Sequence, residues 1–148
     1  MRVDAHQHYW EPQRGDYGWL TPGLDAMYRD FLPDQLEPLL GKYRMDGSVA
    51  VQAAPTVEET KHLLALSDTY PSILGVVGWL DLESPGFAEA LARQREHPKF
   101  VGIRPMIQDL PMTGCWASRL RVPCGFWSGS GFRSISSFAR ACSTVRLS

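Results

Sequence analysis

Short apolar segments recur along the first three quarters of the chain, with stretches of helical spacing between them. The four segments run from Val3 to Tyr9, Gly47 to Gln52, Ile73 to Trp79 and Phe100 to Arg104, and the last three begin about 26 residues apart. Their length and their content of Val, Ile and Phe are typical of buried strands. Strands and helices that alternate at this spacing predict parallel strands joined by helical crossovers, so the predicted fold class is α/β.

Three helices are predicted between these strands. Pro33 suits the first position of a helix that reaches Tyr43, the run Thr56 to Glu59 has the pattern of a capping box, and Ser84-Pro85 opens the third helix. The predicted apolar faces consist of Leu36, Leu39, Leu40 and Tyr43 in the first helix, Leu63, Leu64 and Leu66 in the second, and Phe87 and Leu91 in the third. Because the segment Ile73 to Trp79 is apolar almost throughout, the sheet is expected to be covered on both faces.

A doubly wound sheet and a closed eight-stranded barrel both fit this pattern. No G-x-G-x-x-G follows the first strand and no G-x-x-x-x-G-K-[ST] occurs, which argues against a nucleotide cofactor. In both architectures ligands bind at the carboxyl edge of the strands. Side chains that could bind a ligand or take part in catalysis cluster at the ends of the predicted strands. They are His6 and His8, then Gln52, then Trp79 and Asp81, then Arg104.

The first strand carries two histidines in the stretch "VDAHQHYW". Side chains at i and i+2 of a strand leave the same face, so His6 and His8 are expected to point together. Two neutral imidazoles on one rigid strand suit zinc and related divalent ions. The alternative is that one or both histidines only line a polar pocket.

Composition excludes several other classes of protein. A chain of 148 residues with 44% hydrophobic content makes a globular domain, and its formal net charge of -1 provides no basic field for nucleic acid and no polybasic patch for a membrane. No apolar run is long enough to span a bilayer, and the first residues do not have the pattern of a signal peptide. A cytoplasmic location is therefore expected.

The composition changes after Pro111. Residues 1–111 contain all 16 acidic residues, whereas residues 112–148 contain five arginines, no acidic residue and all three cysteines. We therefore predict a globular region over residues 1–111 and an aberrant, disordered C-terminal tail over residues 112–148.

Four blocks of the first region resemble a known family. The blocks "VDAHQHYW", "VAVQAAPTVEET", "GVVGWLDL" and "FVGIRPMIQDLP" are similar, in this order, to blocks of the amidohydrolase-related metal-dependent hydrolases of TIM-barrel fold. Within that family the sugar-lactone hydrolases similar to fuconolactonase and rhamnonolactonase are the nearest in pattern. The resemblance implies that residues 1–111 form the N-terminal half of a (β/α)8 barrel, with about four βα units. It also implies a small-molecule substrate, a sugar lactone or related carboxylic acid, whose C–O ester bond is hydrolysed.

The same resemblance implies roles for five residues. His6 and His8 would be ligands of a divalent metal ion, zinc or manganese. Arg104 would hold a carboxylate or lactone oxygen of the substrate, and Gln52 and Trp79 would line its pocket. From the residues alone the alternatives stay open: Trp79 can be part of the core, Gln52 can cap a loop, and Arg104 can pair with a neighbouring carboxylate.

The other two histidines are interpreted as structural. His62 lies inside an amphipathic helix, and His97 lies at a helix end before Pro98. Members of the family have further histidines on later strands and an aspartate on the last strand, which acts as the general base. This sequence has no histidine after residue 97 and no carboxylate side chain after Asp109. The catalytic residue is therefore unknown, and the chain alone is expected to be inactive.

A frameshift after Pro111 would explain the tail. One base added before the codon for Met112 lets "MTGCWA" be regrouped as "DDWLLG", which is how the family's motif continues after "QDLP". In the same frame "RSISSF" can be regrouped as the apolar run "FDLLV". The alternative is a natural variable tail. For the function, two other hypotheses remain: a nonoxidative decarboxylase of the same superfamily acting on an aromatic acid, and a non-catalytic pseudogene product or interaction fragment.

Overall fold

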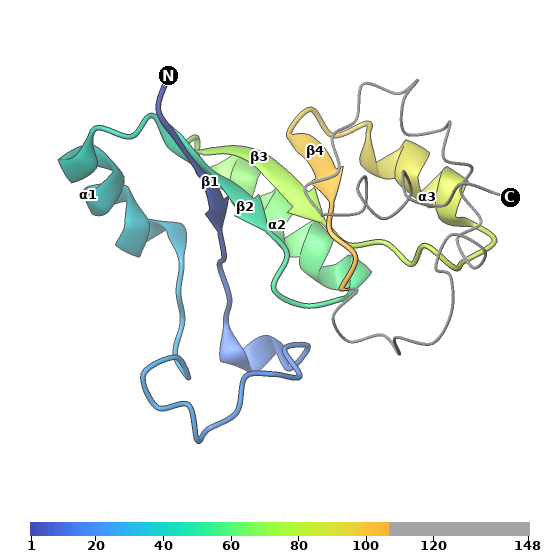
Figure 1. Ribbon diagram of the computed structural model, residues 1–148, viewed down its shortest axis with the longest axis horizontal. Coiled ribbons are helices and arrows are strands. Elements are labelled where there is room, and N and C mark those ends of the chain that lie inside the picture. The colour runs from blue at the N-terminus through green and yellow to red at the C-terminus, as the bar shows by residue number, and fades with distance from the viewer. Residues whose placement is uncertain (107–148) are drawn as a thin grey trace, which may run out of the picture.

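A four-stranded parallel sheet forms the centre of the molecule (Figure 1). The computed structural model describes residues 1–106, so the predicted boundary after Pro111 and the predicted tail lie outside the described residues. Strands β1 (Val3–Gln7), β2 (Gly47–Val51), β3 (Ile73–Gly78) and β4 (Phe100–Ile103) are hydrogen-bonded in the order β1-β2-β3-β4. The α/β class is confirmed. The order is that of consecutive barrel strands, because a doubly wound sheet reverses its strand order at a switch point.

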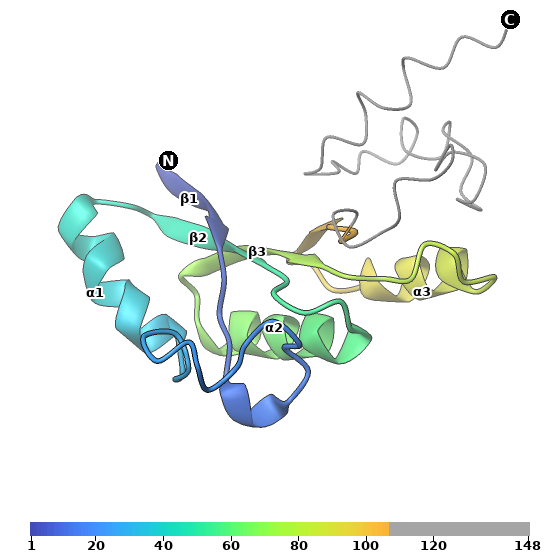
Figure 2. The same cartoon turned by 60° about the horizontal axis from the view of Figure 1, so that its bottom comes forward.

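Three α-helices connect the strands, and all of them pack on one face of the sheet (Figure 2). They are α1 (Pro33–Tyr43), α2 (Val57–Thr69) and α3 (Phe87–Gln94), and a short 3-10 helix, η1 (Pro12–Arg14), lies between β1 and α1. The described residues thus place helices on one face, and what covers the other face lies outside residues 1–106. Right-handed crossovers between strands that never reverse their order all fall on the same side. Among these residues no helix has both the length and the apolar character needed to cross a membrane.

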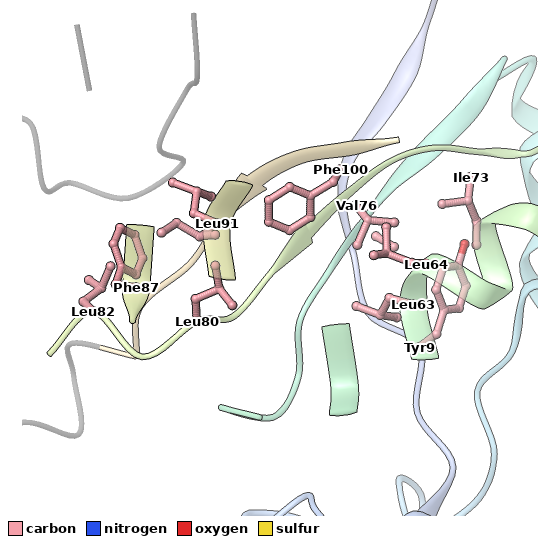
Figure 3. Close-up of a cluster of buried hydrophobic side chains, with 12 residues drawn as sticks. Tyr9, Leu63, Leu64, Ile73, Val76, Leu80, Leu82, Phe87, Leu91 and Phe100 are labelled. Atoms are coloured by element: carbon pink, nitrogen blue, oxygen red, sulfur yellow. The ribbon is translucent and has the colours of Figure 1, made fainter. Parts of the chain in front are cut away.

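One hydrophobic cluster joins the helices to the sheet (Figure 3). Its members come from β2, β3 and β4 (Ala50, Ile73, Val76, Phe100, Ile103), from α2 (Leu63, Leu64), from α3 (Phe87, Leu91), and from neighbouring segments (Tyr9, Leu80, Leu82). Each of these side chains is at most 9% exposed. The burial of this apolar area is the main favourable term that fixes α2 and α3 on the sheet.

The first helix packs along a narrower stripe than predicted. Leu40 is 7% exposed and Leu36 packs against the core cluster, but Leu39 and Tyr43 are 48% and 60% exposed. Figure 1 shows α1 beyond the β1 side of the sheet, where one row of side chains four residues apart can reach the core. The prediction that all four residues share the buried face is therefore wrong for Leu39 and Tyr43.

The predicted helix starts are confirmed in part. Pro33 opens α1, and Thr56 caps α2 by accepting the Glu59 backbone N–H at 3.0 Å. The Glu59 carboxylate does not complete the capping box, because it accepts the backbone N–H of Ala53 instead. Helix α3 begins at Phe87, later than Ser84-Pro85.

Gly78, the last residue of β3, allows α2 to approach the sheet closely. A Cβ atom at this position would lie 2.4 Å from Thr60 Cγ2 and 3.0 Å from the Phe100 ring. Because α2 lies so close to the end of β3, the Thr60 hydroxyl donates to the Trp79 carbonyl at 3.0 Å and accepts the Trp79 N–H at 2.8 Å. The absence of a side chain at Gly78 therefore sets the position of the carboxyl end of β3.

We expect Gly78→Ala to lower the free energy of unfolding by about 1–3 kcal/mol, because the added methyl group overpacks the contact with Thr60. Urea denaturation followed by circular dichroism measures this difference. Gly41→Ala is the matched control, since a Cβ there meets nothing within 4 Å. In a helix interior this substitution is expected to stabilise the protein by about 0.5–1 kcal/mol. Equal stability of the two variants would contradict the packing argument.

Candidate active site

His6 and His8 converge at the carboxyl end of β1. The strand ends at Gln7, two residues earlier than predicted, yet both imidazoles still lie on the same side. Their Nε2 atoms are 3.1 Å apart, and the ring planes meet at 75°. The predicted juxtaposition of the two rings is thus present in the structure.

The two nitrogens fit half of a metal site. Two imidazole nitrogens bound to one tetrahedral zinc ion at about 2.0–2.1 Å lie roughly 3.3–3.4 Å apart, close to the observed separation. Among residues 1–106, however, no group of three or more His, Cys, Asp and Glu side chains could hold an ion. The described part of the chain therefore offers two of the ligands and not a complete set.

The main chain of β2 fixes the His8 ring. His8 Nδ1 lies 2.8 Å from the carbonyl oxygen of Val51, and because a carbonyl only accepts, Nδ1 carries the proton. The Nε2 atom of His8 is thereby left unprotonated, with the lone pair that a metal ligand requires. Burial lowers the pKa of His8, and the charges of His6 and Arg104 lower it further, against the raising effect of the Val51 bond.

Arg104 lies at the same carboxyl edge of the sheet, and its positive charge is one of the causes that lower the pKa of His8. It follows β4, and its backbone N–H donates to the Gly78 carbonyl at 2.9 Å. Its Nη1 atom lies 3.5 Å from the main-chain oxygen of Gln52. The residue is half-buried, so the guanidinium is partly open to a ligand.

Gln52 and Trp79 occupy the ends of β2 and β3 as predicted, but they differ in exposure. The Gln52 side chain is 0% exposed, and its Nε2 donates to the Arg104 carbonyl at 3.0 Å. Trp79 is half-buried, with both polar backbone atoms bonded to Thr60. The structure therefore brings His6, His8 and Arg104 together and places Trp79 at the same edge, whereas Gln52 lies beneath the surface.

The remaining two histidines have structural surroundings. His97 accepts the Lys99 N–H at Nδ1 and contacts the Asp68 carboxylate through Nε2 at 3.1 Å, beside the amino end of β4. His62 faces Glu11, with 3.4 Å between Nε2 and Oε1. Both positions agree with the interpretation that neither histidine belongs to the site.

A buried polar network behind the site was missed by sequence reasoning. Glu59, 0% exposed, accepts the Tyr17 hydroxyl at 2.8 Å and lies 3.4 Å from the Arg14 guanidinium. Arg14 also binds Asp16 at 2.7 Å. Burial raises the pKa of Tyr17 and the Glu59 charge raises it further, so its hydroxyl stays a donor.

This network fastens the long β1–α1 connection to the first turn of α2 and, through the Ala53 N–H that Glu59 accepts, to the loop that follows β2. A second contact does the same, because Trp19 Nε1 donates to the Ala53 carbonyl at 2.8 Å. The capping box at Thr56 marked Glu59 in the sequence, but the partners of Glu59 are about 40 residues away. Local patterns cannot identify such contacts.

Comparison with known proteins gives a consistent result. The sequence model of a family described as Amidohydrolase matches residues 3–128. An L-fucono-1,5-lactonase of Burkholderia ambifaria is 46% identical over 110 residues, which are 74% of this chain and 38% of that protein. An L-fucono-1,5-lactonase of Burkholderia multivorans is 41% identical over 109 residues, 74% of this chain and 36% of that protein. The chain thus spans less than two fifths of the length of these relatives.

Solved structures resemble the fold over the same part. A crystal structure of an amidohydrolase from Burkholderia multivorans with bound zinc aligns with a TM-score of 0.68 at 41% identity, covering 74% of this chain and 38% of that one. Amidohydrolase 2 from Bifidobacterium longum subsp. infantis aligns with a TM-score of 0.64 at 19% identity, over 96% and 56% of the two chains, and shows the fold alone. The resemblance of the sequence blocks is confirmed, and so is the prediction of a partial (β/α)8 barrel.

We expect Arg104→Met to raise the pKa of His8, because the substitution removes a positive charge that disfavours the imidazolium. A pH titration of the imidazole signals by NMR measures the shift in the metal-free chain. Arg93→Met, on the exposed face of α3, serves as the control and should leave His8 unchanged. An unmoved pKa in Arg104→Met would show that the guanidinium is not near His8.

We expect Tyr17→Phe to lower the free energy of unfolding by about 1–3 kcal/mol, because the buried Glu59 carboxylate loses a hydrogen-bond donor. Urea denaturation measures the change. Tyr28→Phe is the matched control, since Tyr28 is 42% exposed and its change should stay within about 0.5 kcal/mol. Similar losses in both variants would contradict a special role of the buried network.

Proposed function

Because this chain belongs to the amidohydrolase family, we propose that its described half of the barrel serves in the metal-dependent hydrolysis of a sugar lactone. The observation that carries the proposal is the convergence of two imidazole nitrogens, 3.1 Å apart, at the strand edge that also holds Arg104. Support for the substrate class comes from the two lactonases, which are 46% and 41% identical to this chain over the matched residues.

His6 and His8 would hold the ion. The fit rests on the separation of their Nε2 atoms and on the Val51 carbonyl, which keeps the proton of His8 on the far nitrogen. Without an ion, the Nε2 atoms of His6 and His8 face each other with one proton between them, which His6 donates because the proton of His8 is on Nδ1. To bind an ion with both Nε2 atoms, His6 must instead carry its proton on Nδ1. A divalent ion, when bound, supplies Lewis acidity that polarises a water molecule or the lactone carbonyl. Zinc suits two imidazoles, and the amidohydrolase from Burkholderia multivorans was crystallised with zinc.

The other residues would act on the substrate. Arg104 presents a guanidinium that can bind the lactone carbonyl oxygen or the carboxylate formed from it, and so stabilises negative charge that develops on oxygen. Trp79 offers an apolar ring at the same edge. Gln52 is buried, so the role in pocket lining that was predicted for it is not supported by its position.

Turnover by the 148-residue chain alone is not expected. Residues 1–106 hold two candidate ligands, and a catalytic zinc ion takes three from the protein and leaves a further position for water or substrate. The Asp4 carboxylate lies near the pair, but its Oδ1 accepts the backbone N–H of His6 at 3.2 Å. We propose that the activity of the family requires side chains beyond those described.

A chimera tests the proposal. The matched segment of the Burkholderia ambifaria lactonase is replaced with residues 1–106 of this chain, and L-fucono-1,5-lactone hydrolysis is measured by proton release with zinc or manganese. We expect hydrolysis, and a loss of at least about 100-fold in kcat/KM for His6→Ala or His8→Ala.

The control is His97→Ala in the same chimera, because His97 lies near the amino end of β4 and should leave kcat/KM unchanged. A folded chimera without lactonase activity contradicts the proposal, as do active His6→Ala and His8→Ala variants. Release of carbon dioxide from an aromatic acid would favour the decarboxylase alternative instead.

A further inference from the structure

Gln52 and Arg104 are hydrogen-bonded to each other, although strand β3 lies between the strands that they follow. They follow β2 and β4, which are separated in the sheet by β3. Gln52 Nε2 donates to the main-chain oxygen of Arg104 at 3.0 Å. In the other direction, Arg104 Nη1 lies 3.5 Å from the main-chain oxygen of Gln52. The two residues therefore form a reciprocal contact over the carboxyl end of β3.

The burial of Gln52 determines what its side chain can do. At 0% exposure it presents no surface to a ligand, and its amide nitrogen is engaged by Arg104. Burying an amide is unfavourable unless its hydrogen bonds are made. The amide nitrogen has its partner in the Arg104 carbonyl, whereas Oε1 is buried without a hydrogen-bond partner among the described residues. The hydrogen bond that the side chain makes is thus to Arg104.

Arg104 is held at both polar atoms of its backbone. Its N–H donates to the Gly78 carbonyl at 2.9 Å, and its carbonyl accepts the Gln52 amide. With the backbone fixed, the guanidinium can move only by rotation about its own side-chain bonds, and the contact of Nη1 with Gln52 limits that rotation. An arginine ordered before binding loses less conformational entropy when it binds a ligand.

We infer that Gln52 is a positioning residue that orients Arg104 toward a carboxylate or carbonyl oxygen of the substrate. The inference rests on the proposed function for the identity of that oxygen. Gln52 itself does not contact the substrate. Its effect on substrate binding therefore depends on the presence of the Arg104 side chain.

A double-mutant cycle on the full 148-residue chain tests the dependence. The probe is L-fuconate, the carboxylate formed when the lactone ring opens, and its dissociation constant is measured by NMR titration. We expect Gln52→Met to weaken binding by about tenfold and Arg104→Met by at least as much. In the Arg104→Met background, Gln52→Met should cause no further loss, because the group through which it acts is gone.

Gln35→Met is the matched control. Gln35 on α1 also donates its side-chain amide to a main-chain oxygen, that of Asp30, but it is exposed and is not one of the candidate site residues. Its removal should leave L-fuconate binding unchanged. Equal losses for Gln52→Met in both backgrounds would show a general structural role and overturn the inference, as would unchanged binding in Gln52→Met.

A second measurement does not depend on any variant folding. The order parameter of the Arg104 Nε–H bond in the unmodified chain should approach the value of about 0.85 found for rigid backbone, whereas exposed Arg93 should fall below about 0.6. A freely rotating Arg104 overturns the inference. A rigid Arg104 in a chain that does not bind L-fuconate supports the positioning role and contradicts the proposed function, so the two failures are distinguishable.

Discussion

The parallel pairing of four consecutive strands is the constraint on which the rest of the structure depends. Because each strand hydrogen-bonds to the next one in the chain, all four carboxyl ends lie along one edge and all three helices fall on one face. His6, Gln52, Trp79 and Arg104 are spread over about 100 residues of sequence, and this topology alone brings their backbones into one row. The chemistry of the site is thus a consequence of the strand order.

Hydrogen bonds to main-chain atoms at that edge then hold the residues of the site. The carbonyl of Val51 fixes the tautomer of His8, the carbonyl of Gly78 holds the backbone of Arg104, and the hydroxyl of Thr60 holds both polar atoms of Trp79. Backbone groups at strand ends have lost their partners in the sheet and must be satisfied by something else. In this protein residues of the site make these hydrogen bonds. The same contacts therefore position the site and satisfy the backbone groups where the sheet ends.

The sequence predicted the strands and the pairing of His6 with His8, because both follow from local periodicity. Leu39 and Tyr43 were placed wrongly, since the width of a buried helix face depends on where the helix lies on the sheet. The burial of Gln52 could not be predicted either, because its amide bonds to a residue 52 positions away. The same holds for Glu59, whose partners Tyr17 and Arg14 are set by the course of a long connection that has no periodic signal.

The histidine pair is the part of the proposed site that the described residues contain. His6 and His8 come from one short segment at the carboxyl end of β1, so the 3.1 Å separation of their Nε2 atoms is set within the described residues. That separation is close to the one expected for two imidazoles on one zinc ion. The affinity for a metal ion depends on the number of protein ligands, because each further ligand adds to binding and replaces water at one coordination position. Under the proposed function, zinc affinity reports how many protein ligands the ion has, independently of whether lactone is turned over.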